Sequence, residues 1–343
     1  MAPLLRARQS LSKERLPSYF ASLKSQPYHD PNLSTRPSAS GSVTGIRSIA
    51  WNPLGSLVAT GSADRILRVW NPEKPNVRFS TELKGHQAPI EQVAFNPVKD
   101  AELCSVSNDG VVKFWDVRTK ACINEVKGLG EAFTLAWAPD GQSLVVGNKN
   151  NNVFVLSPTQ STPLSSHQQS VETNQIAFCW SGEKVFVATG DGKVRVLSYP
   201  DFEPVLRVPY TTEEGESEEF TLNGHTSTCH SVAVNPTGRY VASGGADSVI
   251  ALWDTTDWIC QRTITSLVGP VKSISFTFDG SYVVGGIAEE SGLEISHTES
   301  GEHVHSLKTA GVCPVVAWAP TRYCLAYSDA GSLRIIGVDT DRK

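Results

Sequence analysis

The chain has 343 residues, of which 40% are hydrophobic and 19% charged, and its formal net charge is −5. This composition is ample for a buried core, as one large β domain or two smaller ones. No apolar run approaches the ~18 residues that span a bilayer, and the first residues lack the continuous apolar stretch of a secretory signal.

A strand pattern with alternating apolar positions, often closed by an aromatic residue, recurs seven times. It predicts strands at 46–51, 90–95, 132–137, 173–178, 229–234, 271–276 and 313–318. The closing residues are separated by 44, 42, 41, 56, 42 and 42 positions. A period in the low forties is typical of propeller blades with four strands each, so we expect an all-β, seven-bladed propeller. The one long interval contains 211–219, an acidic stretch without apolar residues that predicts a disordered insertion.

Within each repeat, a turn rich in Pro, Gly or Asp leads to a second apolar strand, such as 144–149 or 240–245. A tight turn and a third strand, such as 66–70 or 249–254, follow. Five of these tight turns carry an aspartate, namely Asp64, Asp109, Asp191, Asp247 and Asp329. Blade three has "NKNNNV" at this turn and blade six has "AEESGL", so looser turns are predicted in those two blades.

The third strand of blade seven ends near the C-terminus, so its fourth strand must come from elsewhere. The segment 34–40, just before blade one, is predicted to supply it as an edge strand, where Pro37 is tolerated. The predicted organisation is therefore a basic, partly disordered extension over 1–33 and a propeller over 34–343. A closed ring of this kind leaves only short, protected sheet edges.

Gly-His dipeptides at 85–86 and 224–225 precede two blades, and Trp-Asp pairs at 115–116 and 253–254 end two third strands. These motifs resemble the WD-repeat family, in which a His, the turn Asp, a strand Ser or Thr and the Trp form a hydrogen-bonded network inside one blade. A buried carboxylate and imidazole satisfy each other in this way, so the role is structural. The resemblance implies two such networks, His86, Ser107, Asp109 and Trp115 in blade two, and His225, Ser243, Asp247 and Trp253 in blade five.

Motifs that carry enzymatic chemistry do not emerge from the sequence. It contains no P-loop, Rossmann glycine pattern or GxSxG elbow, so we expect neither catalysis nor a cofactor. His303 and His305 share one face of a predicted strand, but a zinc site needs further ligands, and no metal is predicted. The seven cysteines are scattered without a CxxC pair, which is typical of buried thiols in a reducing compartment.

The position four residues before each closing residue lies where a first strand emerges at the ring opening. A nucleic-acid funnel would be mostly basic there, whereas a mixed set with an aromatic favours protein contacts; solvated strand ends are the alternative. The residues at this position are Arg47, Glu91, Phe133, Asn174, His230 and Lys272, followed by Pro314 in blade seven.

Charge is unevenly placed along the chain. Residues 1–36 contain six basic and two acidic side chains, a net +4, which leaves −9 for the rest of a chain whose total is −5. An acidic propeller disfavours direct phosphate binding. Any contact with RNA is therefore expected to be indirect or to use the basic N-terminal tail.

Four stretches, 115–123, 137–151, 197–205 and 244–254, are similar to the THO-complex branch of the WD-repeat family, and the similarity extends from about 45 to 338. The N-terminus and the acidic insertion depart from that branch. The resemblance implies a nuclear, non-enzymatic scaffold in the THO/TREX assembly, which couples transcription to messenger-RNA packaging and export. Its implied partners are the other THO subunits, above all the large helical scaffold subunit. The alternative is a generic adaptor that binds peptides or histone tails at the ring opening.

Overall fold

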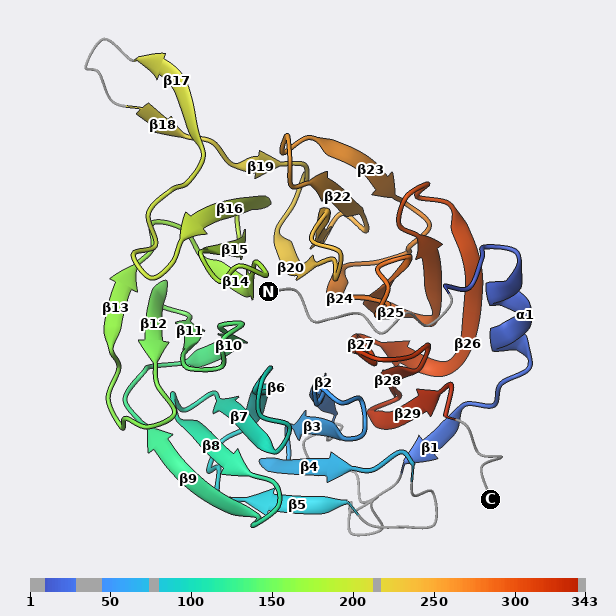
Figure 1. Ribbon diagram of the computed structural model, residues 1–343, viewed down its shortest axis with the longest axis horizontal. Helices are drawn as coiled ribbons and strands as arrows, with labels where there is room; N and C mark the ends of the chain where they lie inside the picture. The colour runs from blue at the N-terminus through green and yellow to red at the C-terminus, as the bar shows by residue number, and fades with distance from the viewer. Residues whose placement is uncertain (1–9, 29–44, 74–79, 212–216, 339–343) are drawn as a thin grey trace.

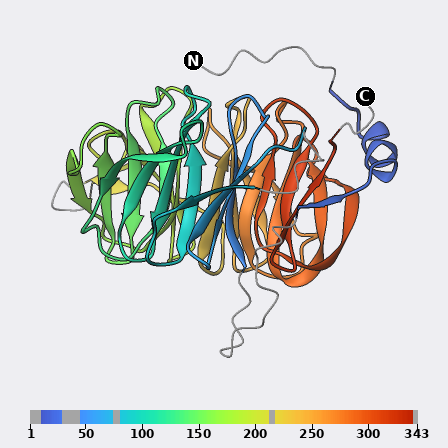
Figure 2. The same ribbon diagram turned by 90° about the horizontal axis from the view of Figure 1, so that it is seen from below.

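The computed structural model describes residues 10–28, 45–73, 80–211 and 217–338. In these ranges seven antiparallel sheets surround one axis as the blades of a propeller (Figure 1). Figure 2 shows the ring edge-on as a single layer of blades, with the strands running across its thickness. The predicted all-β, seven-bladed fold is confirmed.

The first three blades are four-stranded sheets joined in simple order. Their strands are β2 (Ile46–Trp51), β3 (Val58–Ser62), β4 (Ile66–Trp70) and β5 (Thr81–Lys84); β6 (Ile90–Phe95), β7 (Glu102–Ser107), β8 (Val112–Asp116) and β9 (Ala121–Val126); β10 (Ala132–Trp137), β11 (Leu144–Asn148), β12 (Asn152–Leu156) and β13 (Ser165–Gln168).

The remaining blades include two departures from this order, an extra ribbon in blade four and one long strand in blade six. Their strands are β14 (Thr173–Phe178), β15 (Lys184–Thr189), β16 (Lys193–Ser198) and β19 (Leu222–Asn223), with the ribbon β17 (Arg207–Thr211) and β18 (Ser217–Glu219); β20 (Cys229–Val234), β21 (Tyr240–Gly245), β22 (Ile250–Asp254) and β23 (Cys260–Ile264); β24 (Val271–Phe276), β25 (Tyr282–His297) and β26 (His303–Cys313); β27 (Val316–Trp318), β28 (Leu325–Asp329), β29 (Ser332–Ile336) and β1 (Gln26–Tyr28).

The innermost strands of blades one to six have the bounds that the repeat pattern predicts. In blade seven the innermost strand, β27, begins three residues later than predicted, because Cys313 still belongs to β26 and pairs with Ile287. Pro314 lies between the two strands, and its ring nitrogen has no hydrogen to donate to a ladder. The difference from the predicted strand bounds is therefore confined to the junction between β26 and β27.

The hydrophobic core consists of seven clusters of buried residues in the described part of the chain, one between each pair of neighbouring blades. Between blades one and two, Leu67 and Leu83 pack against Ile90, Val93 and Leu103. Because side chains alternate along a strand, both faces of a blade contribute to these clusters. Each blade is therefore stabilised by its two neighbours.

Polar side chains of the innermost strands also join one blade to the next. Ser48 Oγ accepts a hydrogen bond from the Val93 N–H at 3.1 Å. Gln92 Oε1 likewise accepts one from the Leu135 N–H at 2.8 Å. An innermost strand has no further strand beside it in its own sheet, so these bonds satisfy backbone donors that would otherwise face the axis.

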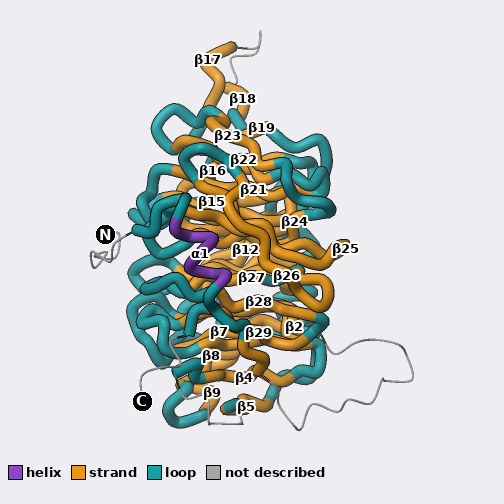
Figure 3. Tube along the Cα trace, turned by 90° about the vertical axis from the view of Figure 1, so that its right-hand side faces the viewer, coloured by secondary structure: helices purple, strands orange, loops and turns teal. Residues whose placement is uncertain are grey.

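An N-terminal strap, residues 10–28, lies on the outer rim at blades six and seven. Its helix α1 (Arg15–Ala21) packs against β26 (Figure 3). Leu16 and Phe20 are four positions apart and share one helix face, and both are buried in the cluster between these blades. Before the helix, Leu11 O accepts a hydrogen bond from the Tyr282 hydroxyl at 2.6 Å. The strap is thus part of the folded ring.

The fourth strand of blade seven is β1, which pairs antiparallel with β29. The predicted closing segment, 34–40, lies outside the described residues, and the closing strand comes from an earlier part of the N-terminal segment. Three residues are too few to show an alternating pattern, and Pro27 occupies an edge position that needs no donor there. The predicted extension over 1–33 is corrected accordingly, because residues 10–28 belong to the propeller.

The acidic insertion of blade four departs from its prediction as well. β17 and β18 form a two-stranded ribbon, with Arg207 opposite Glu219, that projects outward from the ring (Figure 1). Residues 212–216 between them lie outside the described residues. At the base, Arg195 donates from Nε and Nη2 to the two carboxylate oxygens of Glu219, both at 2.8 Å. Disorder over 211–219 is thus corrected at the C-terminal end, where this ion pair and strand pairing fix the chain.

Both turns that were predicted to be loose are held by specific contacts. In blade three, Asn150 stands at the position of the turn aspartate, and Asn148, the last residue of β11, accepts the N–H groups of Asn150 and Asn152 through its Oδ1 at 3.0 and 2.9 Å. In blade six, the segment "AEESGL" lies inside β25, whose first half pairs with β24 and whose second half pairs with β26. The departures from the repeat pattern therefore replace an aspartate turn by other contacts.

The cysteines form no disulfide, and all seven lie within the described ranges. Cys104, Cys229, Cys313 and Cys324 are buried, as predicted for such thiols, whereas Cys122 is exposed. The other two are half-buried. Among the described residues, no helix is long and apolar enough to cross a membrane.

Candidate interaction surface

Blade five contains a hydrogen-bonded network of the predicted composition. His225 bonds Asp247 through Nδ1 at 3.1 Å and Ser243 through Nε2 at 2.8 Å. Trp253 Nε1 donates to the same Ser243 hydroxyl at 2.9 Å. Burial alone would raise the pKa of Asp247, but the Thr226 N–H and the His225 ring donate to the carboxylate and lower it overall. The polar groups satisfy one another inside the blade, which suits a structural role.

Blade two brings only part of the predicted network together. His86 Nε2 and Trp115 Nε1 meet at the hydroxyl of Ser105, at 2.7 and 2.8 Å, and Ser107 is not their partner. Ser107 instead donates to Asp109, and His86 Nδ1 is buried without a hydrogen-bond partner among the described residues. Burial, and then a nearby lysine charge, lower the pKa of His86 to about 4. The imidazole is therefore neutral at physiological pH.

The wrong choice of Ser107 follows from the sequence "SVSND", which offers two serines. The hydroxyl that meets the indole lies ten positions before the Trp in both blades. Blade one has the same spacing, and Trp70 Nε1 donates to Thr60 Oγ1 at 3.0 Å. The sequence reasoning missed this third contact, although the fixed spacing would have identified it.

The predicted ring-opening residues of blades one to six share one backbone feature. Each is the extra residue of a β-bulge in its innermost strand. In β2, for example, Ile46 pairs with Ser62 and Ser48 pairs with Gly61, which leaves Arg47 between them. A bulge changes the direction of the side chain of the extra residue. The bulged residues are Arg47, Glu91, Phe133, Asn174, His230 and Lys272.

Five of the six bulged residues contact a neighbouring blade. Arg47 forms an ion pair with Glu91 across blades one and two. Asn174 Nδ2 donates to a backbone carbonyl of blade five at 2.8 Å. His230 Nε2 and Lys272 Nζ lie 3.0 Å apart, and burial together with the lysine charge lowers the pKa of His230. The contacts thus run from blade to blade around part of the opening.

Phe133 is the aromatic member of this set and is half-buried. In the same blade, Lys149 forms an ion pair with Glu131. The pKa of Lys149 is raised, chiefly by Glu131 and to a smaller extent by Glu91 in the next blade. Lys149 and Glu131, which the sequence reasoning did not select, therefore extend the surface. The six bulged residues with these two are called the ring-mouth surface below.

Among the described residues, no group of three or more His, Cys, Asp or Glu side chains is placed to hold a metal ion. His303 forms an ion pair with Glu294 at 2.5 Å. His305 stacks on Phe20 of the strap, with ring centroids 6.0 Å apart. Both histidines of the predicted pair thus contact other protein groups.

Seven antiparallel blades, with Trp indoles that meet Ser or Thr hydroxyls inside three of them, define a WD-repeat β-propeller protein. The family model for the WD domain, G-beta repeat, matches residues 35–71, 78–116 and 216–254, which contain the first three strands of blades one, two and five. The Trp–hydroxyl contacts lie in the same three blades.

Comparison with curated proteins shows which WD-repeat proteins this chain resembles. THO complex subunit 3 of Arabidopsis thaliana is 33% identical over 307 residues, which cover 86% of this chain and 93% of that protein. WD repeat-containing protein AAC3 of Dictyostelium discoideum is 31% identical over 301 residues, 82% of this chain and 61% of that protein. Protein groucho of Drosophila melanogaster is 24% identical over 249 residues, 71% of this chain and 31% of that protein. The chain belongs to the family of THO complex subunit 3.

Proposed function

We propose that the protein is a non-enzymatic scaffold subunit of a nuclear THO/TREX assembly that couples transcription to the packaging and export of messenger RNA. The observation that carries this proposal is the similarity to THO complex subunit 3 along nearly the whole of that protein. Its partners are then the other THO subunits, above all the large helical scaffold subunit. Contact with RNA is indirect or made by the basic N-terminal tail.

The ring-mouth surface is the site that we propose for these partners. Its charges are of both signs and are largely paired, as in the Arg47–Glu91 and Lys149–Glu131 ion pairs. Phosphate binding would call for unpaired basic groups, whereas a half-buried aromatic among paired charges suits a protein interface. Phe133 is the expected anchor, because aromatic side chains carry much of the free energy of binding at such interfaces.

The test is a pull-down of the large helical THO subunit with the double variant Phe133→Ala, Lys272→Glu. We expect weaker capture by this variant than by the unchanged protein, with the same circular dichroism spectrum. The matched control is Ile123→Ala with Lys84→Glu, which removes an exposed apolar residue and reverses an exposed charge on the outer strands. Full retention of the partner by the first variant would exclude the ring mouth as the binding site.

A second candidate is a generic adaptor that binds peptides or histone tails at the ring opening, favoured by the bulges that direct side chains there. The same preparation distinguishes the two functions. Micromolar binding of histone-tail peptides without capture of any THO subunit would favour the adaptor.

A further inference from the structure

The turns between the first and second strands form the face of the ring opposite the ring-mouth surface. Their third residue differs sharply among blades. In blades one and two it is aliphatic, and Leu54 and Val98 are 62% and 63% exposed. In the other five blades it is polar, and the residues there are Asp140, Ser181, Thr237, Asp279 and Thr321.

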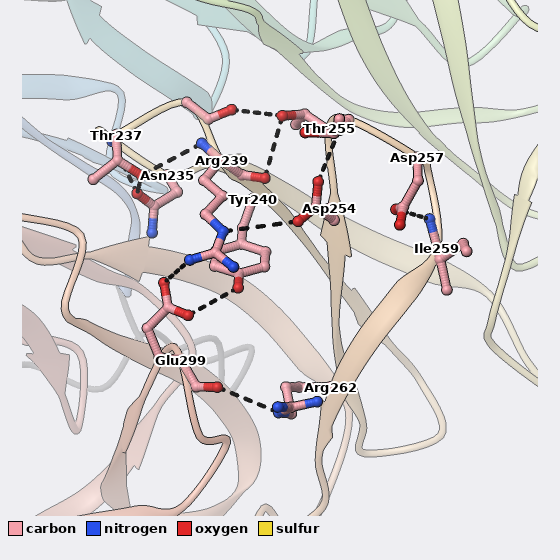
Figure 4. Close-up of polar contacts among 12 residues, drawn as sticks. Asn235, Thr237, Arg239, Tyr240, Asp254, Thr255, Asp257, Ile259, Arg262 and Glu299 are labelled. Atoms are coloured by element: carbon pink, nitrogen blue, oxygen red, sulfur yellow. Dashed lines mark hydrogen bonds and ion pairs between the residues drawn. The ribbon is translucent and has the colours of Figure 1, made fainter.

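The polar residue has a structural task in these turns. In blades three to six its side-chain oxygen accepts the N–H of the residue two positions later, at 2.9–3.3 Å. Figure 4 shows this in blade five, where Thr237 accepts the Arg239 N–H. Arg239 in turn bonds Glu299 of blade six at 2.9 Å, so the polar groups here are satisfied within the protein. Leu54 and Val98 lack an oxygen for this task, and the fold gives no reason for aliphatic residues at these exposed positions.

The two aliphatic turns are neighbours. Asn52 Nδ2, at the start of the blade-one turn, lies 3.5 Å from the Asp100 carbonyl oxygen at the end of the blade-two turn. Leu54 and Val98 therefore belong to adjoining turns on one face of the ring. Large exposed apolar side chains on adjoining turns of one face, with charged groups around them, are typical of protein interaction sites.

The charges beside Val98 are arranged with the basic groups outward. The Lys99 side chain is 54% exposed, whereas its partner Glu102 is 11% exposed. Arg118 is 70% exposed, whereas its partner Asp100 is 39% exposed. Lys120, in the adjoining turn between the third and fourth strands, is also exposed. A partner that approaches Val98 therefore meets positive charge first. Beside Leu54, Arg322 donates to the Gly55 carbonyl oxygen and is 20% exposed, whereas its partner Glu73 is 56% exposed.

We propose that Leu54 and Val98, rimmed by Lys99, Arg118 and Lys120, form a second docking surface for an amphipathic protein segment that carries aliphatic and acidic side chains. The aliphatic side chains of the segment cover Leu54 and Val98, and its carboxylates pair with the exposed basic groups. This surface lies on the opposite face from the ring-mouth surface. The two surfaces can therefore bind different segments at the same time.

The experiment is a fluorescence-anisotropy titration of the full chain with two labelled synthetic peptides. Both have leucines at the same positions of one helical face, and they differ in carrying glutamate or lysine at all other positions. We expect the glutamate peptide to bind at least about tenfold more tightly than the lysine peptide. The double variant Leu54→Thr, Val98→Thr is expected to weaken its binding by at least about tenfold. Thr stands at this position in blades five and seven, so the variant suits the turn.

The control is Val268→Thr, which removes an equally exposed valine, 64% exposed, from a loop between β23 and β24. It should bind the glutamate peptide like the unchanged protein. A second variant, Lys99→Glu with Arg118→Glu, leaves both aliphatic residues in place and should reverse the preference between the peptides. Equal affinity for the two peptides, no binding of either, or unchanged binding by the threonine variant would overturn the proposal. Tighter binding of a uridine-rich RNA oligonucleotide than of the glutamate peptide would overturn it too. None of these outcomes depends on which assembly contains the protein.

Discussion

Asp247→Ala is the most informative perturbation of the blade interior. The Asp247 carboxylate accepts hydrogen bonds from His225 Nδ1 at 3.1 Å, the Thr226 N–H at 3.0 Å and the Val249 N–H at 3.3 Å. Its removal leaves a buried imidazole nitrogen without an acceptor. Hydrogen bonds to charged groups contribute about 1.5–3 kcal/mol, so we expect the free energy of unfolding to fall by about 2–3 kcal/mol.

Blade two supplies the matched control, because Asp109 does not bond His86. It accepts hydrogen bonds from the Ser107 hydroxyl and, at 3.3 Å, from the Val111 N–H. Asp109 is exposed, so water competes for these bonds, and Asp109→Ala should cost only about 1 kcal/mol. Urea unfolding followed by tryptophan fluorescence measures both variants. If Asp247→Ala unfolds like the unchanged protein, or if the two variants cost the same, the His225 network does not stabilise blade five.

Three further outcomes follow from the fold. Deletion of residues 1–28 should lower the melting temperature in differential scanning fluorimetry, because burial of Leu16 and Phe20 contributes about 3–6 kcal/mol. Deletion of 1–9 should leave the melting temperature unchanged, and equal melting of the two truncations would contradict this. Replacement of 208–218 by a short Gly-Ser turn should leave melting unchanged, because the ribbon projects from the ring, and a large decrease would show that it supports blade four. The pKa of His86 is lowered from 6.5 to about 4 in the folded protein, so the unfolded chain binds this proton more readily. The free energy of unfolding should therefore fall as the pH drops from 6.5 towards 4, by roughly 3 kcal/mol at most. A His86→Gln variant should lose that part of the pH dependence, and a pH profile identical to that of the unchanged protein would contradict the shift.

The repeated strands were predictable because they share local signals, an alternating apolar pattern, an aromatic closing residue in every blade except blade five, and a Pro- or Gly-containing turn. The closing strand β1 was not, because its three residues carry no periodic pattern. The helix α1 did carry a signal in the four-residue spacing of Leu16 and Phe20, but the basic composition of the N-terminal segment favoured an extension.

The residues of the candidate sites were also predictable only in part. The positions of the ring-opening residues followed from the repeat, but their bulges and their pairing across blades depend on how neighbouring blades approach, which a single repeat does not encode. Ser105 was missed because two serines compete within one short strand. Lys149 was missed because it lies in a turn, away from the strand positions that the repeat pattern identifies.

The central claim is that the protein acts as a fixed subunit of a larger assembly. Its most direct test is purification of the tagged full chain from nuclear extract after ribonuclease treatment, followed by quantitative mass spectrometry and native mass measurement. We expect one complex in which the chain and the other THO subunits are present in a constant ratio that survives loss of RNA. Recovery as a single chain, or with a changing set of substoichiometric partners, would contradict the scaffold function.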